Sequence, residues 1–328
     1  MRLRFWGTRG SIATPGPCTT RYGGNTSCIE LTEASGEKIV LDCGTGARLL
    51  GNQLLAASDG SVSATILLTH THWDHIQGFP FFAPLFAQGN HFRVYGPEGA
   101  HLSLRDVLAG QMEHHYFPVE LDQLAARITY QDLGEGTHDI AGLKITAQQM
   151  NHPSPTLGYR IAGDGCTICY LSDHEPFYEA IWRDGAEPGR LESILEPGDR
   201  RHAEFMQGAD LVIHEAQYTP DEYPAKEHWG HSTYSYVVKL AAAAGVRRLV
   251  LTHHDPSHDD VFMDAVEQLA RGLAQRLDSR LEVTCAYEGL EISVQPLVRR
   301  GATPVEKCSS GSASPGSGSA CSSTGNPW

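Results

Sequence analysis

The sequence predicts an α/β protein, a sandwich built on mixed β-sheets. Short runs with the composition of β-strands, punctuated by Gly and Pro, follow one another in the first part of the chain. In the second part such runs alternate with helical segments. Hydrophobic residues make up 41% of the 328 residues and charged residues 20%, which is the balance of a globular protein with a sizeable core.

The individual elements follow from local composition. Strands are expected at 2–6, 27–31, 38–42, 64–69, 92–95, 143–148, 157–161, 166–171, 210–214, 248–252 and 282–294. Helices are expected at 101–112, 199–207, 232–244 and 260–277. From about Gly301 the chain consists mostly of Ser, Gly, Ala and Pro, which cannot bury a core. We therefore expect one large domain over residues 1–298 and a disordered tail over 299–328.

Charge and hydropathy limit the partners. Lys and Arg number 25 against 39 Asp and Glu, so the net charge is 25 − 39 = −14, which weighs against a broad cationic surface for long nucleic acid. No apolar run approaches the ~20 residues of a transmembrane helix. The first residues also lack the apolar segment of a secretory signal. The sequence thus predicts a cytoplasmic protein with no membrane partner.

Two of the eight cysteines, Cys166 and Cys169, have the spacing of a zinc or redox motif. They lie in an apolar, β-rich run with no second pair. Alternation along a strand places them on opposite faces. We therefore expect both to be packing residues.

The segment after the strand expected at 64–69 carries the strongest functional signal. Four side chains of metal-binding types lie within six residues: His70, His72, Asp74 and His75. Residues two apart in extended chain project from the same side, so the first two can share one ion while the others face a second. Imidazole together with carboxylate suits zinc and also admits manganese or iron.

The run His70-Thr-His-Trp-Asp-His75 resembles the H-x-H-x-D-H signature of the metallo-β-lactamase-fold hydrolases. This resemblance implies a four-layer αβ/βα sandwich with two mixed β-sheets. It also implies three further ligands: an isolated histidine, an acidic residue at a strand end, and a histidine after a late strand. His152, Asp173 and His253 match these positions.

The resemblance implies two divalent ions, most readily zinc, that share one bridging carboxylate. The expected ligands are His70, His72 and His152 for one ion, Asp74, His75 and His253 for the other, and Asp173 as the bridge. Asp42 matches an early aspartate that orients the ligand loop in this family. His254 directly follows His253, and the residues alone leave either as the ligand, although the family pattern of a strand ending in Leu-Thr-His favours His253.

Two further motifs are similar to those of the ribonuclease Z branch of this family. Gly230-His-Ser-Thr233 matches its helix-opening His-Ser-Thr motif, and His214-Glu-Ala216 matches its His-Glu-Ala-Thr motif. The resemblance implies that His231 acts on the scissile phosphate or leaving oxygen and that Glu215 orients it; with Asp74 they form the expected catalytic group. A phosphodiester transition state gathers charge where a positioned imidazole can donate. The alternative is that Ser232 is only the N-cap of the following helix, with His231 beside it.

These residues favour hydrolysis over redox chemistry. Two ions that share a carboxylate normally also share a water, which they activate to hydroxide near neutral pH. No Gly-x-Ser-x-Gly elbow or Cys/His pair competes as a side-chain nucleophile. Di-iron members of the family typically carry Glu at the position of His72, so the intact pattern indicates a hydrolase.

The resemblance to phosphodiesterase branches extends to the N-terminus. The run Phe5–Ser11 is similar to their opening strand and Gly-rich loop, which makes Arg9, with Asn25 nearby, an expected contact of the substrate phosphate. Ribonuclease Z commonly carries a long basic arm for tRNA, often between the ligands matched by His152 and Asp173. Here only 173 − 152 − 1 = 20 residues lie between them. A small anionic phosphodiester such as a 3′,5′-cyclic nucleotide is therefore the expected substrate.

Three other functions remain open. The same metals could serve a lactone, ester or thioester hydrolase, or a ligand-binding protein without turnover. A tRNA 3′-processing endonuclease is the third, through a partner subunit or a basic face that the composition does not reveal. Dimers are common in this branch, so the resemblance also makes a homodimer an expectation.

Overall fold

Two seven-stranded β-sheets organise the described part of the chain, which comprises residues 1–99, 101–178, 190–278 and 280–296 of the computed structural model. The tail expected over 299–328 lies outside the described residues. Among the helices that the structure describes, none combines the length and the apolar content needed to cross a membrane.

The first sheet draws mostly on the N-terminal part of the chain and has the order β14-β1-β2-β3-β4-β5-β6. Its strands are β1 (Arg2–Gly7), β2 (Cys28–Thr32), β3 (Lys38–Leu41), β4 (Ser63–Leu67), β5 (His91–Pro97), β6 (Arg127–Leu133) and β14 (Glu291–Ser293). The pairings from β14 to β3 are antiparallel, and those from β3 to β6 are parallel. The sheet is therefore mixed, as predicted.

The second sheet has the order β13-β12-β11-β10-β9-β8-β7 and is also mixed. Its strands are β7 (Gly136–Ile140), β8 (Leu143–Gln149), β9 (Leu157–Gly163), β10 (Cys166–Leu171), β11 (Leu211–Glu215), β12 (Arg248–Thr252) and β13 (Glu282–Cys285). The pairings from β7 to β10 are antiparallel and those from β10 to β13 are parallel.

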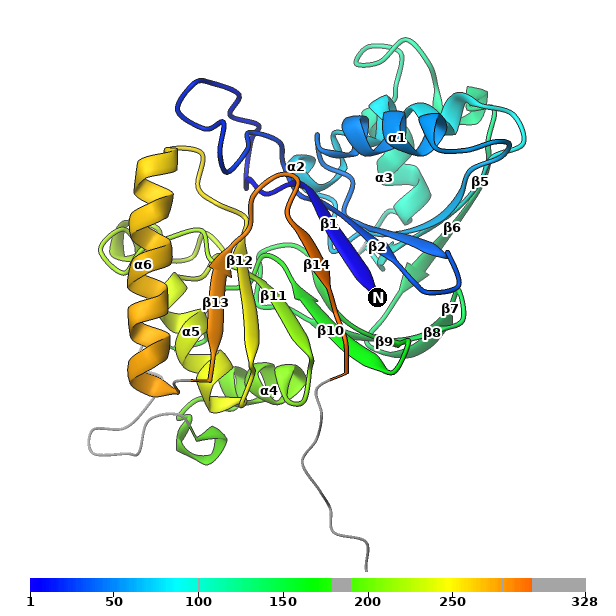
Figure 1. Cartoon of the computed structure of the whole chain (residues 1–328). Coiled ribbons are helices and arrows are strands. Elements are labelled where there is room, and N and C mark those ends of the chain that lie inside the picture. The colour runs from blue at the N-terminus through cyan, green and yellow to red at the C-terminus, as the bar shows by residue number, and fades with distance from the viewer. Residues whose placement is uncertain (100, 179–189, 279, 297–328) are drawn as a thin grey trace, which may run out of the picture. The chain divides into compact units, whose positions relative to one another are not determined.

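Helices cover the outer face of each sheet (Figure 1). The α-helices are α1 (Ala47–Ala56), α2 (Trp73–Ile76), α3 (Leu104–Gln111), α4 (Pro197–Met206), α5 (Tyr234–Ala243) and α6 (Asp260–Leu277). Short 3-10 turns occupy Phe79–Phe81, Ala83–Phe86, Leu121–Gln123, Leu191–Ser193 and Tyr223–Ala225. With α1 and α3 on the first sheet and α4 to α6 on the second, the layers are helix, sheet, sheet and helix. The predicted four-layer sandwich is confirmed.

Three apolar cores lie between these layers. One is formed by the facing sides of the two sheets, one by the first sheet with α1 and α3, and one by the second sheet with α4 to α6. Cys166 belongs to the core between the sheets and Cys169 to the core under α4 to α6. Both are free and buried, so their predicted packing on opposite faces of one strand is confirmed.

Capping residues set the start of the two helices that follow the metal-binding motifs. Helix α6 begins at Asp260, as predicted, because the side chain of Asp259 accepts the N–H of Phe262 at 2.8 Å. Helix α5 begins two residues later than predicted, because its N-cap is Thr233, whose side chain accepts the N–H of Tyr236 at 3.2 Å. The alternative that Ser232 is the N-cap is therefore wrong.

The expected single strand over 282–294 is wrong. The chain turns through Gly289, which has a φ of 87°, so that β13 closes the second sheet and β14 joins the first. Strands β6 and β7 were not predicted, because they lie at the sheet edges, where their half-exposed residues are mostly polar. Helix α1 was also missed, since it follows Gly46 without a side-chain cap.

Candidate metal centre

The predicted metal-binding residues lie in loops where strands of both sheets end. In the first sheet they follow β4 and enter the short helix α2. In the second sheet they follow β8, β10 and β12. The residues, in chain order, are His70, His72, Asp74 and His75 from the first sheet and His152, Asp173 and His253 from the second. Because the carboxyl ends of parallel strands share one edge, residues separated by up to 183 positions meet there.

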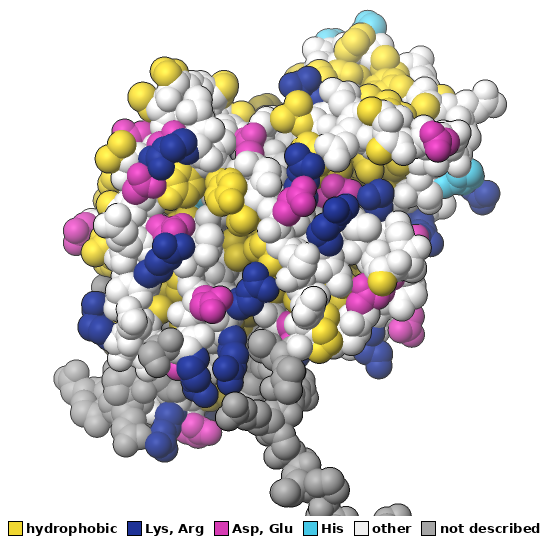
Figure 2. All heavy atoms as spheres, viewed as in Figure 1, with side chains coloured by type: hydrophobic (Ala, Val, Ile, Leu, Met, Phe, Trp, Pro, Cys, Tyr) yellow, Lys and Arg dark blue, Asp and Glu magenta, His cyan; other side chains and the backbone are white. Residues whose placement is uncertain are grey.

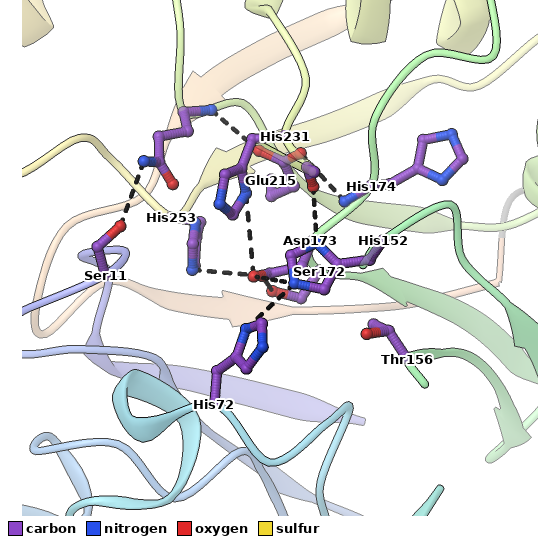
Figure 3. Close-up of polar contacts among 12 residues, drawn as sticks. Ser11, His72, His152, Thr156, Ser172, Asp173, His174, Glu215, His231 and His253 are labelled. Carbon is purple, nitrogen blue, oxygen red and sulfur yellow. Dashed lines mark hydrogen bonds and ion pairs between the residues drawn. The ribbon is translucent and has the colours of Figure 1, made fainter. Parts of the chain in front are cut away.

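Asp173 lies between His72, His231 and His253 in Figure 3 and also contacts other members of the group. Its Oδ2 is 3.4 Å from His70 Nε2 and 3.7 Å from His152 Nε2. Its Oδ1 is 3.3 Å from both His75 Nε2 and His253 Nε2. One carboxylate thus presents a different oxygen to each of two histidine pairs.

The donor atoms of the predicted ligands form two neighbouring sets, and Asp173, His231 and His253 form a third group of this kind. In the first, one atom from each of His70, His72, His152 and Asp173 lies within 4.8 Å of the others. In the second, the same holds for Asp74, His75 and His253. These are the two sets that the family resemblance implies, with Asp173 beside both.

The donor set fits divalent metal ions. His75 Nε2 and His253 Nε2 approach to 3.1 Å, and His70 Nε2 is buried with no hydrogen-bond partner among the described residues. Buried imidazole nitrogens that converge on carboxylate oxygens are a typical environment for zinc and similar cations. Electrostatics agree: although burial opposes charge, nearby histidines hold the pKa of Asp74 and of Asp173 well below the usual range, so both carboxylates are anionic.

Contacts behind the rings fix which nitrogen faces the centre. The fully buried carboxylate of Asp42 accepts a hydrogen bond from His75 Nδ1 at 2.8 Å and from the N–H of Thr69 at 2.7 Å. His152 Nδ1 donates to the carbonyl of Gly230 at 2.9 Å. In both histidines Nε2 is therefore the nitrogen that points inward.

The backbone around the centre is tight. Asp42, Asp173 and His253 have φ values of 58°, 46° and 60°, a left-handed conformation that non-glycine residues rarely adopt and that is concentrated at functional sites. A Cβ at Gly10 would lie 2.4 Å from the ring of His253, and one at Gly230 would lie 2.3 Å from His152 Nδ1. These glycines let the chain pass directly against the rings.

His231 lies beside the two sets. Its Nδ1 is 3.9 Å from Asp173 Oδ2, and its ring stacks on that of His253 with centroids 5.2 Å apart. Burial lowers the pKa of His231 to about 3, so the imidazole is neutral near neutral pH. A neutral ring keeps one N–H to donate.

Glu215 ends β11 and is fully buried, and burial raises its pKa to about 8. Its carboxylate accepts the backbone N–H groups of His174, Gln217 and Ser232. Its described hydrogen bonds therefore hold the backbone next to His231 rather than the imidazole itself.

Glu175 was not predicted, yet it holds the other side of His231. Its buried carboxylate accepts the N–H of Gly230 and the hydroxyl of Tyr223, each at 3.0 Å, and the N–H of His228. Nothing in the local sequence distinguishes Glu175 from a surface acid, because all three donors lie about 50 residues further along the chain.

The structure places the two side chains expected to contact a substrate near the N-terminus, Arg9 and Asn25, against other parts of the chain. Arg9 is fully buried, and its guanidinium donates to the carbonyls of Gly23, Asp255 and His258 at 2.7, 3.2 and 2.6 Å. The side-chain amide of Asn25 donates to the carboxylate of Glu288 at 3.1 Å. Both side chains form hydrogen bonds to neighbouring loops.

The N-terminal run does reach the centre through its backbone. The N–H of Ser11 donates to Asp74 Oδ2 at 2.7 Å.

The structure also distinguishes His253 from His254, the two adjacent candidates for one ligand position. His254 Nε2 donates to the carbonyl of Ala286 at 2.8 Å, whereas His253 Nε2 lies 3.0 Å from Asp74 Oδ2. His253 is the one that faces the centre.

Comparisons with known proteins agree with the fold and the site. A family model described as the beta-lactamase superfamily domain matches residues 37–188. A ribonuclease Z of Kineococcus radiotolerans is 28% identical over 325 residues, which cover 91% of this chain and 98% of that protein. The structure of the short form of human tRNase Z superposes with a TM-score of 0.54 at 24% identity, covering 90% of this chain and all of that one. Yeast PDE1 superposes with a TM-score of 0.59 at 16% identity, covering 88% and 98%.

The chain has the metallo-β-lactamase fold, and its sequence is similar to proteins named Ribonuclease Z. It is a metal-dependent hydrolase.

Proposed function

We propose that the protein is a phosphodiesterase that works with two divalent ions, most readily zinc. The observation that carries the proposal is the position of Asp173, whose two oxygens face different histidine pairs while His231 lies 3.9 Å away. The proposed ligands are the five histidines and two aspartates already described as converging there, and the proposed catalytic group is Asp74, His231 and Glu215.

The chain's own residues orient the substrate and stabilise the leaving group. When bound, the two ions supply Lewis-acid activation of a water molecule and of the phosphate oxygens. His231 donates its N–H to the leaving oxygen, where negative charge develops. Glu175 and Glu215 hold the amides of Gly230 and Ser232 on either side of that ring, which limits its movement.

For the substrate, the relatives favour an RNA phosphodiester over a cyclic nucleotide. Proteins named Ribonuclease Z match this chain at 25–29% identity over most of their length. We therefore propose cleavage of the 3′ trailer of a precursor tRNA as the first candidate reaction.

A small diester, such as a 3′,5′-cyclic nucleotide, is the second candidate. A specific observation favours it: the 20 residues between His152 and Asp173 are largely taken up by the β9–β10 hairpin, which leaves no length there for a basic arm. On the face in Figure 2, basic side chains are interspersed with acidic ones rather than gathered in a band. Such a surface gives little counterion release with a long polyanion.

The test has a general arm and a substrate arm. Metal-loaded protein should hydrolyse bis(p-nitrophenyl) phosphate, and His231→Ala should reduce kcat by roughly 100-fold. His91→Ala is the matched control, because His91 begins β5 at the opposite end of the first sheet's parallel strands. A precursor tRNA with a 3′ trailer and a cyclic-nucleotide panel then separate the two candidates. Fully metallated protein that hydrolyses a lactone but no diester would overturn the proposal.

A further inference from the structure

A groove of about 440 Å³ opens beside the metal centre, and its described lining residues include His152. We name it the aromatic groove and define it by His152, Phe177, Tyr178, Tyr223, Glu227 and His228. We propose that the aromatic groove binds the nucleoside next to the scissile phosphate, with its base stacked on Phe177 and Tyr178. This inference rests on the phosphodiesterase function proposed above.

The position of the groove follows from His152. The same imidazole that lies 3.7 Å from Asp173 Oδ2 forms part of the groove wall. His152 therefore belongs to both the centre and the groove, and we place the nucleoside of a phosphate bound at the centre on the groove side of this residue. A volume of about 440 Å³ lies in the range of small-molecule sites and accommodates one nucleoside.

Two aromatic side chains offer a stacking surface. Phe177 is 48% exposed and Tyr178 is 55% exposed. Phe177 is also held in place, because its ring meets that of His174 at 5.8 Å and a Cβ at Gly198 would lie 2.6 Å from it. A fixed aromatic ring with an exposed surface stacks on any base, since every base has a π-face.

The charge of the groove decides which part of a nucleotide it takes. The described lining residues include Glu175 and Glu227 and contain no Lys or Arg. Carboxylates repel a second phosphate, so the groove suits the uncharged base and sugar rather than an extended backbone. This restricts the proposal to a single nucleoside beside the cleaved bond.

The part of the groove formed by Tyr223 and His228 is ordered before a ligand arrives. Glu175 accepts the hydroxyl of Tyr223 at 3.0 Å and the N–H of His228. His228 is held at a φ of 69°, which is costly for a non-glycine residue and persists only where neighbouring contacts fix it. Binding therefore has little ordering cost on this side.

The experiment compares diesters with and without a base on metal-loaded, full-length protein. The substrates are the 5′- and 3′-(4-nitrophenyl phosphate) esters of thymidine, and base-free ethyl 4-nitrophenyl phosphate. Phe177→Ala and Tyr178→Ala should each lower kcat/KM about tenfold on one thymidine ester, mainly through KM, and leave the ethyl ester unchanged. Phe177→Tyr and Tyr178→Phe should restore wild-type values. Tyr116→Ala, which removes an exposed aromatic residue outside the groove, is the control.

The outcomes separate the groove from the proposed function. Equal losses on the ethyl and thymidine esters, or no loss on either thymidine ester, would overturn the aromatic groove. If the metallated wild type hydrolysed no diester, the proposed function would fail instead. Calorimetric binding of thymidine 5′- and 3′-phosphate to wild type and to the two alanine variants then tests the groove without turnover. Unchanged affinity in both variants would reject it.

Discussion

The replacement Asp42→Asn should weaken metal binding about 10–100-fold while the protein remains folded. Asp42 Oδ2 accepts hydrogen bonds from His75 Nδ1 at 2.8 Å and from the Tyr170 hydroxyl at 2.7 Å, and Oδ1 accepts from Thr69 N–H at 2.7 Å. In the variant, the amide oxygen can keep the bond to Thr69, which places the NH₂ group opposite the other two donors. The Tyr170 hydroxyl can rotate and accept.

His75 has no such freedom. To avoid two opposing donors its proton must move from Nδ1 to Nε2, and Nε2 is the nitrogen that lies 3.3 Å from Asp173. The tautomer change therefore places a hydrogen on the atom that would bind the ion. Loss of such an outer contact typically costs 10–100-fold in metal affinity, which equals about 1.4–2.7 kcal/mol.

The assay is a competition titration of chelator-stripped protein against a chromophoric zinc chelator. Thermal unfolding of the stripped variant reports separately on the fold. Asp59→Asn is the matched control, since Asp59 is exposed and precedes β4, whereas the ligands follow the other end of that strand. Folded Asp42→Asn that binds zinc as tightly as wild type would refute the reasoning that Asp42 fixes the tautomer of His75.

Four further outcomes are expected. Asp173→Asn should release both ions, because one carboxylate faces both sets; elemental analysis that still finds one ion per chain would contradict this. Gly10→Ala should also weaken metal retention in dialysed protein, because its Cβ would lie 2.4 Å from the His253 ring; full retention would show that the ring can shift without consequence. Thr233→Ala removes the N-cap of α5 and should lower the free energy of unfolding in urea by about 1 kcal/mol, with the metal content unchanged. Removing the ions with a chelator should lower Tm, because a ligand present at 100 times its Kd stabilises the folded state by about 2.7 kcal/mol. An unchanged Tm after chelation would argue against a bound ion.

The first half of the metal centre could be predicted from the sequence because its residues are local. His70, His72, Asp74 and His75 follow one apolar strand, and geometry alone directs them to one edge. The distant ligands could be found only through family resemblance, since nothing in the segment around His152 marks it as a neighbour of His70.

The features that differ from the expectations depend on long-range packing. A Gly-rich turn with Arg9 is typical of a phosphate-binding loop, but carbonyls about 250 residues away take up its guanidinium. The strand expected over 282–294 divides at Gly289 because each half pairs with a different sheet. Glu175 was missed for the same reason, since its role depends on donors that sequence order does not place beside it.

The pairing of β14 with β1 in the first sheet has a consequence for folding during synthesis. Among the described strands, β14 is the last in sequence, and it pairs with the otherwise free edge of β1, the first of them. Until residues 291–293 emerge, β1 presents unpaired backbone groups on that side, which other chains could join. The first sheet therefore keeps this edge open until residues 291–293 have been synthesised and pair with β1.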